Sequence, residues 1–446
     1  MAKKKKYTSI EDYGLIGNLN TTALVSKDGS IDFLPFTRFD SPTLFGAILD
    51  KDKGGYFSIA VKDTEANHKQ LYLPDTAILL TRYLTNDGIA ELTDFMPVME
   101  EGTQLAVVRK LKIIKGEHTF RIELNPRFNF GRNDFITEID NNKIIIRNKT
   151  KKKQAFCLIS NVEFKNDKDK LHADVRLKTK DEIKMVMISA EESGNFENIK
   201  SLKYYTEKSF EKTVRFWRDW VGKSTYKGRW QDVVNRSAIT LKLLTSFQYG
   251  STVAAATLGL PEQIGGERNW DYRFTWIRDA AFTMYSFLQL GYTDEARKFI
   301  GWIKERSNEI KSARELKLMY RIDGSSDLKE VKLKNLEGYK GSAPVRIGNG
   351  AFNQFQLDIY GELVDTIYIY NKNAEPISYE FWLGLMKFID FVCENWKEKD
   401  RGIWEVRDDQ REFLISKVMS WVALDRGILI AEDRSFPAPL ERWRKT

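Results

Sequence analysis

The chain has 446 residues, of which 42% are hydrophobic and 30% are charged, and this length predicts two large domains in a globular protein. The 71 basic and 63 acidic residues leave a net charge of +8, and this near balance argues against a nucleic-acid partner. No apolar run is long enough to span a bilayer, so no membrane partner is expected either.

The first 200 residues or so are predicted to form strands. Short runs rich in branched and aromatic residues alternate with turn signals, such as Asp28-Gly29 and Asn86-Asp87-Gly88. Many short strands joined by hairpin turns indicate an antiparallel β-sandwich. The clearest strands are expected at residues 22–26, 30–34, 77–84, 89–96, 105–114, 119–124, 142–148 and 184–189.

From about residue 203 the hydrophobic spacing changes to that of helices. Thr293 and Ser378 are predicted N-caps, and Gly291 is expected to end a helix. Long aromatic or glycine-rich loops separate the helices, which favours a helical array with a site at one end. The expected helices cover residues 204–222, 230–248, 277–291, 293–307, 353–371, 378–399 and 416–433, and the last residues begin one more.

Cysteine and histidine are scarce and scattered. Cys157 and Cys393 lie far apart, and the lysine-rich start has no apolar segment behind it, so a cytoplasmic protein without a secretory signal is expected. His68, His118 and His172 are isolated, which argues against a zinc site and a histidine-based triad. No metal or other cofactor is therefore expected, and acid–base chemistry should depend on carboxylates.

The loop at residues 259–274 leads into a stretch where aromatic and charged residues lie side by side. Aromatic rings stack on the C–H faces of sugars, and a guanidinium beside a carboxylate can hold two neighbouring hydroxyls. The pair Arg278–Asp279 therefore suits a terminal glucose. The alternative is that the tryptophans belong to the core and that Arg278–Asp279 is a structural ion pair. The aromatic residues are Trp270, Tyr272, Phe274 and Trp276.

Glu405 occupies an apolar part of a second loop. Its neighbours Ile403, Trp404 and Val406 are expected to desolvate the carboxyl group and to raise its pKa. A carboxylic acid that stays protonated near neutral pH is what a glycosidase needs to protonate a leaving oxygen. The alternative is a surface glutamate, or one paired with Arg407.

A third loop, at residues 338–352, continues into a run of amide side chains. Asn353, Gln354 and Gln356 offer donors and acceptors for sugar hydroxyls, although such residues equally cap helices.

Four segments together resemble glycoside hydrolase family 15, which holds glucoamylases, glucodextranases and a branch of trehalases. The resemblance covers most of the chain, and the segments occur in the family's order. It implies an N-terminal antiparallel β-sandwich (residues 1–202), a linker helix (203–228) and an (α/α)6 barrel (from 229 to 446). The four segments are residues 10–49, 268–282, 350–362 and 402–432.

The resemblance implies exo-acting hydrolysis of α-glucosides with inversion at the anomeric carbon. Release of glucose from the non-reducing ends of α-glucans is the first expectation, and trehalase activity is the alternative. By analogy, Glu405 is the general acid. The resemblance also implies a glucose subsite shaped by Trp276, Arg278 and Asp279, a stacking role for Tyr272 and a flanking position for Trp404.

The second carboxylate that inversion needs is not evident in this sequence. In the family it lies late in the barrel, in a motif that this chain does not show. Asp408, Asp409 and Glu412 are too close to Glu405 in sequence, and Glu362 and Asp365, on one helix, carry no special signal.

The number of helices points the same way. An (α/α)6 barrel needs twelve, so the sequence predicts an incomplete barrel, which exposes apolar inner faces to water. One interpretation is an enzyme whose barrel a separate polypeptide completes. The other is a non-catalytic, carbohydrate-binding remnant.

Overall fold

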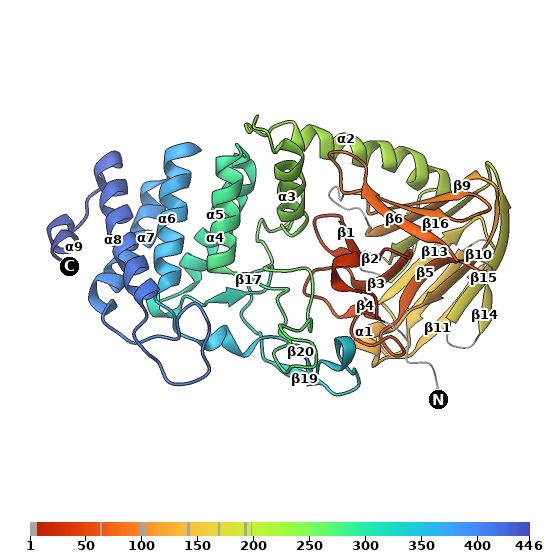
Figure 1. Ribbon diagram of the computed structural model, residues 1–446. Helices are drawn as coiled ribbons and strands as arrows, with labels where there is room; N and C mark the ends of the chain where they lie inside the picture. The colour runs from red at the N-terminus through yellow and green to blue at the C-terminus, as the bar shows by residue number, and fades with distance from the viewer. Residues whose placement is uncertain are drawn as a thin grey trace.

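The computed structural model describes residues 7–62, 65–98, 104–140, 143–167, 170–190, 194–197 and 199–446. The lysine-rich start of the chain lies outside these residues. Strands gather in one half of the molecule and helices stand side by side in the other half (Figure 1). None of the helices described is both long and apolar enough to cross a membrane.

The first sheet is antiparallel throughout, with the order β1-β2-β3-β5-β10-β15-β14 and with β4 paired to β3. The turn at Asp28-Gly29 joins β2 to β3 as predicted, and Gly29 has a φ of 85°, which glycine adopts without strain. The strands are β1 (Tyr13–Gly17), β2 (Thr22–Ser26), β3 (Ser30–Pro35), β4 (Thr43–Phe45), β5 (Tyr56–Val61), β10 (Glu117–Asn125), β14 (Lys165–Asp167) and β15 (Lys170–Lys178).

The second sheet has the order β11-β12-β13-β16-β9-β8-β7-β6 and is also antiparallel. Leu84 pairs with Ile89 across the predicted turn Asn86-Asp87-Gly88, so β7 and β8 form a hairpin. The strands are β6 (Asn67–Tyr72), β7 (Leu79–Leu84), β8 (Ile89–Phe95), β9 (Ala106–Lys115), β11 (Phe135–Asp140), β12 (Lys143–Asn148), β13 (Ala155–Ser160) and β16 (Glu182–Ser189).

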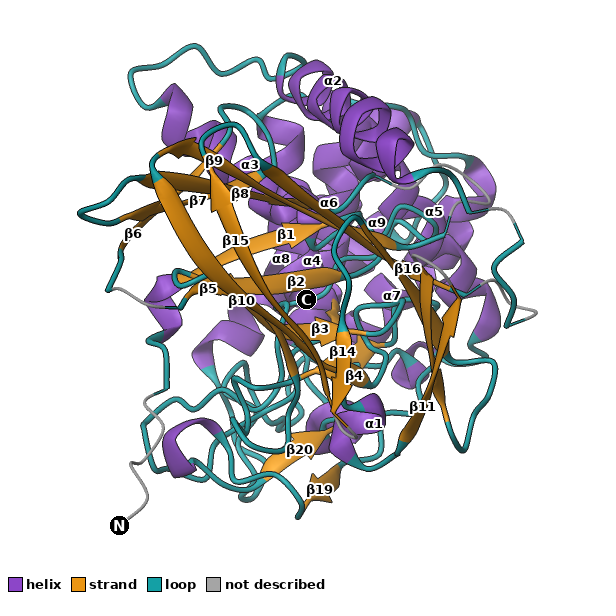
Figure 2. Ribbon diagram, turned by 90° about the vertical axis from the view of Figure 1, so that its right-hand side faces the viewer, coloured by secondary structure: helices purple, strands orange, loops and turns teal. Residues whose placement is uncertain are grey.

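The two sheets enclose an apolar core, and Figure 2 shows them from the end of the molecule where they lie. Alternate residues of β8 and β9, such as Ala90, Leu92, Val107 and Leu111, are fully buried in that core. This is the predicted β-sandwich, because one face of each sheet packs inward. The opposite face of β9, β13 and β16 is also apolar, and Val108, Cys157 and Val186 there form a second buried cluster with the linker segment.

A helix and a short π-helical turn connect the sandwich to the helical half. The turn (Tyr204–Lys208) runs into α2 (Ser209–Val221), which lies across the strands in Figure 1. Phe210 of α2 packs edge-to-face on Phe95 of β8, with ring centroids 5.5 Å apart. The linker helix is therefore fixed to the sandwich by aromatic packing.

The helical half has inner helices that pack on one another and outer helices behind them. In the inner layer, α6 lies between α4 and α8, and in the outer layer α5 packs against α7. The helices are α3 (Gln231–Leu243), α4 (Ile277–Gln289), α5 (Thr293–Glu309), α6 (Asp358–Asn373), α7 (Tyr379–Asn395), α8 (Leu414–Arg434) and α9 (Leu440–Lys445).

The predicted helix ends are partly correct. Ser378 caps α7, because its side chain accepts a hydrogen bond from the Phe381 amide at 3.2 Å. Gly291 follows α4 with a φ of 87°, as expected for a helix stop. Thr293 was the wrong N-cap: α5 begins at this residue, after Tyr292, and no side chain caps it.

The helix expected from residue 353 begins later, at Asp358. The Asn349 side chain accepts from the Ala351 amide and starts a 3-10 turn at Gly350–Asn353, after which the chain is extended. The Leu357 amide at the start of α6 donates to the distant Asp400 carboxylate at 2.8 Å. The first turn of α6 is thus fixed by a residue some forty positions later, which local sequence does not reveal.

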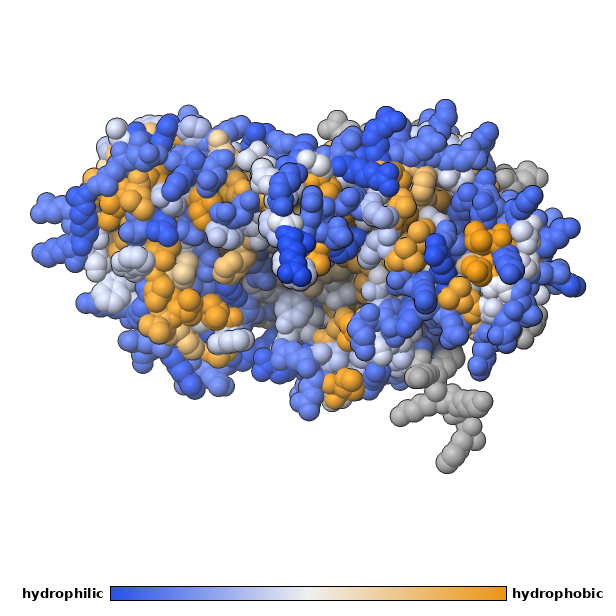
Figure 3. All heavy atoms as spheres, turned by 45° about the horizontal axis from the view of Figure 1, so that its top comes forward, coloured by the Kyte–Doolittle hydropathy of each residue, from blue (hydrophilic) through white to orange (hydrophobic). Residues whose placement is uncertain are grey.

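The ring of inner helices is open. Apolar side chains of α4 and α8 are exposed to solvent, and Figure 3 shows hydrophobic patches over the helical half. A closed barrel would cover such side chains. They are Phe282 (58% exposed) and Tyr285 on α4, and Leu414, Val418 and Trp421 (62% exposed) on α8.

Candidate active site

A short strand, β17 (Thr275–Trp276), leads into α4 at one end of the helical half. It pairs with β18 (Met319–Tyr320), and the Ile277 amide donates to the Leu318 carbonyl at 3.0 Å. These bonds fix the direction in which Trp276 and the first turn of α4 point.

The residues before β17 attach this loop to the sandwich. The guanidinium of Arg273 binds both oxygens of Asp271 at 2.9 Å and donates to the carbonyls of Phe39 and Ser41. Arg273 and Asp271 are buried, so each charge depends on the other for compensation. No local pattern in the sequence marks this pair.

Glu405 lies against Trp276. The indole N–H of Trp276 donates to Glu405 Oε1 at 2.7 Å, although the two residues are 129 positions apart. Trp276 is nearly fully buried, in agreement with the alternative that it belongs to the core. Its one polar atom nevertheless faces the carboxyl group. The loops that the sequence singled out therefore meet at one place.

The Glu405 backbone is in the left-handed region, with a φ of 52°, which a residue other than glycine adopts at a cost. Asp400 holds the turn in place: its carboxylate accepts from the Gly402 amide, the Leu357 amide and the Ser416 hydroxyl. One buried carboxylate thereby connects the Glu405 loop to the starts of α6 and α8.

Arg278 has a different partner from the one the sequence suggested. Its Nη1 donates to Asp358 Oδ2 at 2.7 Å, and its Nη2 is 3.7 Å from Glu405 Oε1. The interpretation of Arg278–Asp279 as a structural ion pair is thus wrong. The Asp279 side chain is exposed to solvent. Partial desolvation by the surrounding protein raises its pKa, and the charge of Arg278 lowers it.

Two glutamines connect Arg278 to the Glu405 turn. Gln356 is fully buried, accepts from Arg278 Nη1 at 3.1 Å and donates to Gln354 Oε1 at 3.2 Å. Gln354 in turn donates to the Glu405 carbonyl at 3.2 Å. These amides, predicted to bind hydroxyls or to cap helices, instead bond to the protein.

Burial raises the pKa of Glu405, as predicted, but not through its sequence neighbours alone. Trp404 is 77% exposed and points away from the protein interior. Arg407 pairs with Glu330 at 3.0 Å, and that pair replaces the suggested pairing of Arg407 with Glu405. The surroundings that desolvate Glu405 come from α4 and α6 as well as from its own loop.

Two aromatic residues flank the carboxyl group and its approach. The ring of Tyr272 lies 5.8 Å from that of Trp276 and is about one-third exposed, so it offers a face to a ligand. Trp270 is not a core residue: the guanidinium groups of Arg346 and Arg407 lie 4.7 and 4.2 Å from its ring centroid. This cation–π arrangement stiffens the loop edge beside the site.

Glu362 was dismissed on its sequence and has an unusual setting. It lies one helical turn after Asp358 on α6, where burial and the nearby charge of Asp358 raise its pKa to about 7. The polarity of Asp358, Glu362 and Asp365 at helical spacing was visible in the sequence. What the sequence could not show is that this stripe faces the other inner helices.

The assembled site offers a carboxyl group with a raised pKa, a guanidinium, an exposed carboxylate and an open aromatic face. This set can donate a proton and bind the hydroxyls of a neutral polar ligand. Among the residues described, no three His, Cys, Asp and Glu side chains are grouped to hold a metal ion.

Comparisons with known proteins match both halves of the chain. Residues 228–446 match the family described as glycosyl hydrolases family 15, and residues 3–200 match a trehalase-like N-terminal domain. A trehalase of Thermoplasma volcanium is 35% identical, and the alignment covers 98% of this chain and 69% of that protein. A trehalase of Mycolicibacterium smegmatis is 32% identical, with coverage of 99% and 69%.

The fold has a counterpart among solved structures. A bacterial glucoamylase complexed with acarbose superposes with a TM-score of 0.70 at 13% identity, and covers 99% of this chain but 66% of that one. This likeness confirms the predicted fold class, an N-terminal β-sandwich followed by an incomplete (α/α)6 barrel. From its sequence similarity, its two matching domains and its fold, the chain belongs to glycoside hydrolase family 15.

Proposed function

We propose that this chain carries the acid half of an inverting trehalase site, in which Glu405 protonates the oxygen between the two glucose units. The observation that carries the proposal is the junction of Glu405 with Trp276 and Arg278 at the open ends of the inner helices. A carboxyl group with a raised pKa is suited to donate a proton to a leaving oxygen.

The surrounding residues have defined tasks in this proposal. Arg278, Asp279 and Trp276 shape the subsite for the glucose that is attacked. Tyr272, whose ring is partly open to solvent, stacks near the bond that breaks. Trp404 is strongly exposed and would flank the acid only when a ligand or another polypeptide lies against it.

Trehalose is favoured over the ends of α-glucans as the substrate. The curated relatives named above are trehalases, and they align along nearly the whole of this chain. The first expectation from sequence, a glucoamylase, has support only from a fold likeness at 13% identity, which does not bear on the substrate.

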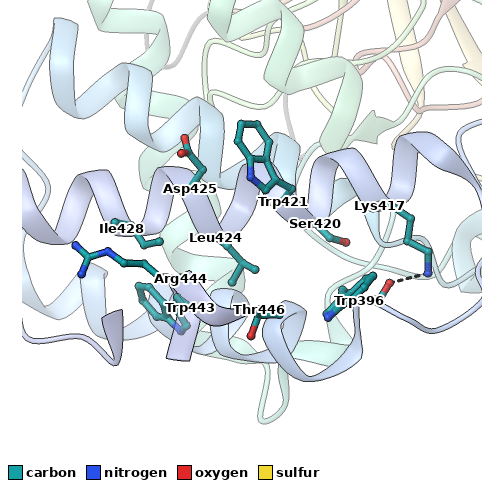
Figure 4. A pocket seen from close by; sticks show the side chains of 10 residues that line it. All are labelled: Trp396, Lys417, Ser420, Trp421, Leu424, Asp425, Ile428, Trp443, Arg444 and Thr446. Carbon is teal, nitrogen blue, oxygen red and sulfur yellow. Dashed lines mark hydrogen bonds between the residues drawn. The ribbon is translucent and has the colours of Figure 1, made fainter. Parts of the chain in front are cut away.

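The second carboxylate is proposed to come from polypeptide that covers the open ring. The chain spans 69% of the length of the Thermoplasma relative, and an inverting site needs two carboxyl groups roughly 6.5–9.5 Å apart. A groove beside α8, shown in Figure 4, is available to such a segment. Its lining includes Trp396, Trp421, Leu424, Ile428 and Trp443.

The boundaries proposed for the parts are residues 1–202 for the sandwich, 203–228 for the linker helix and 229–446 for the partial barrel. A cytoplasmic location remains part of the proposal.

The test is to incubate the chain with trehalose and, separately, with maltotriose, and to follow the anomers of glucose by proton NMR. Inversion of trehalose releases one α-glucose and one β-glucose at early times, whereas retention would release α-glucose alone. Replacing Glu405 with Gln should lower the rate by about 100- to 10,000-fold, because the proton donor is lost.

The outcomes separate the interpretations. Glucose from maltotriose but not from trehalose would overturn the trehalase assignment in favour of a glucoamylase. Trehalose binding by calorimetry without any glucose release would favour the carbohydrate-binding alternative. Full activity in the Glu405→Gln variant would remove Glu405 as the acid.

A further inference from the structure

Arg278 lies between two carboxylates and is bound mainly to one of them. Its Nη1 donates to Asp358 Oδ2 at 2.7 Å and to Gln356 Oε1 at 3.1 Å. Its Nη2 donates to the Ile403 carbonyl at 3.4 Å and forms a longer ion pair with Glu405 Oε1 at 3.7 Å. The guanidinium is therefore hydrogen-bonded to Asp358 on α6 and lies close to the acid without a hydrogen bond to it.

Asp358 is a buried residue and is not exposed at the surface of the candidate site. It is the first residue of α6 and is fully buried, and its Oδ1 has no hydrogen-bond partner among the described residues. A buried carboxylate with one unpaired oxygen is costly, and the guanidinium of Arg278 offsets part of that cost. The start of a helix also favours a negative charge.

The distance of Arg278 from Glu405 matters for the chemistry of the acid. A guanidinium in direct contact with a carboxyl group stabilises its charged form, and a general acid must instead keep its proton until the transition state. The groups facing Glu405 are Trp276, Tyr272, Arg278 and Asp279 around the start of α4, and Asp358 on α6, with Glu362 and Asp400 behind Asp358. Arg278 is the only cation in this set.

We propose that Asp358, assisted by Gln356, is a positioning residue that takes the hydrogen bonds of the Arg278 guanidinium, so that Arg278 forms none with Glu405 and Glu405 keeps its proton. The inference rests on the proposed role of Glu405 as the acid. Burial is the largest influence on Glu405 and raises its pKa. Trp276 and Arg278 lower that pKa, whereas Asp279 and Asp358 raise it.

The test replaces Asp358 with Asn, which keeps the shape and removes the charge. Arg278 is then free to pair with Glu405, and the protonation midpoint of Glu405 should fall by about one pH unit. The midpoint is measured by carbodiimide labelling across pH 4–8, with the modified fraction of Glu405 quantified by peptide mass spectrometry. This readout does not require turnover.

Turnover gives a second readout of the same change. With trehalose as substrate, the basic limb of the kcat/KM profile should move to lower pH in Asp358→Asn, because Glu405 loses its proton earlier. A defect that is only structural would lower the rate at every pH and leave the limb in place. Asp358→Glu, which restores the charge, should restore the midpoint.

Two further variants provide matched controls. Asp365→Asn removes the same charge from the same helix, but Asp365 pairs with Arg426 at 2.6 Å, so the midpoint of Glu405 should stay where it is. Trp276→Phe removes a hydrogen bond to the carboxylate and should move the midpoint to higher pH, opposite to Asp358→Asn.

An unchanged Glu405 midpoint in folded Asp358→Asn protein would overturn the inference. If that variant does not fold, Gln356→Met removes the neutral acceptor of Arg278, together with the donor to Gln354, and should give a smaller shift in the same direction. No shift there would overturn the inference as well. A failure of the proposed function gives a different result. If Glu405→Gln is fully active, Glu405 is not the acid, but the shift in its labelling midpoint caused by Asp358→Asn is still observed.

Discussion

Glu362 shows how a single side chain depends on the charges around it. On α6 it follows Asp358 by one turn, and its surroundings raise its pKa to about 7. A carboxyl group in this setting resists ionisation, because the charged form lacks water and faces other negative charges. The folded protein therefore binds a proton at Glu362 that the unfolded chain, with a pKa near 4.5, has already lost.

The protonation of Glu362 makes the free energy of unfolding depend on pH. Stability contributed by the protonated form is fully present below about pH 4.5 and is lost as the pH rises through about 7. Glu362→Gln should therefore stabilise the protein at pH 8 by about 1–3 kcal/mol, discounted for partial exposure, and have little effect at pH 4. Urea denaturation at the two pH values measures the difference, and equal effects at both would contradict it.

Glu405, Arg278 and Trp276 were predicted as site residues from the sequence and its resemblance to a family, and the structure brings the three side chains together. Asp358 and Asp400 were not singled out, and Gln356 was predicted to bind hydroxyls or to cap a helix rather than to bond to Arg278. Their importance comes from bonds that span 43 to 80 positions, and no local pattern distinguishes a carboxylate that holds a distant backbone amide from one that faces water.

Among the helices, hydrophobic periodicity predicted where most of them lie, and the capping interactions determined the residue at which each one begins. Ser378 and Thr293 looked alike in sequence, yet only Ser378 caps its helix. The chain before α5 turns through Gly291 and Tyr292, so α5 begins at Thr293 itself and the threonine hydroxyl is not placed as a cap. Half of the strands in the two sheets were not among the clearest predicted runs: β1, β4, β5, β6, β11, β13, β14 and β15.

The two residues form a matched experiment. Ser378→Ala should destabilise the protein by about 1 kcal/mol, because the Phe381 amide loses its acceptor. Thr293→Ala removes a hydroxyl from the first residue of α5, where no side chain caps the helix, and should change stability by less than about 0.5 kcal/mol. Both values come from chemical denaturation, and equal losses would show that the difference in capping has no energetic consequence.

At the scale of the whole molecule, the site depends on the junction between the sandwich and the helical half. Arg273 crosses this junction: it pairs with Asp271 in its own loop and donates to the Phe39 and Ser41 carbonyls of the other half. The sequence predicted both halves but not their contact, since nothing marks Arg273 as different from the other arginines.

Arg273→Met should cost about 3–5 kcal/mol, because Asp271 remains buried without its counter-charge. Arg38→Met is the control: Arg38 also spans the junction, with Asp323 at 2.9 Å, and its side chain is 31% exposed. Its second partner, the buried Asp40, keeps Arg321 as a counter-charge at 3.1 Å, so the loss of Arg38 should cost about 1 kcal/mol. Denaturation midpoints measure both. A loss for Arg273→Met no larger than that of its control would mean that the buried pair does not hold the halves together.

The left-handed backbone of Glu405 has an evolutionary consequence. Asparagine adopts this conformation at a lower cost than glutamate does. Selection for stability alone would therefore favour Asn at position 405, and the proton donor would be lost. A lineage that keeps glutamate at this position has a less stable turn but retains the proton donor. The residue at this one position should therefore distinguish descendants selected for hydrolysis from those selected only to remain folded.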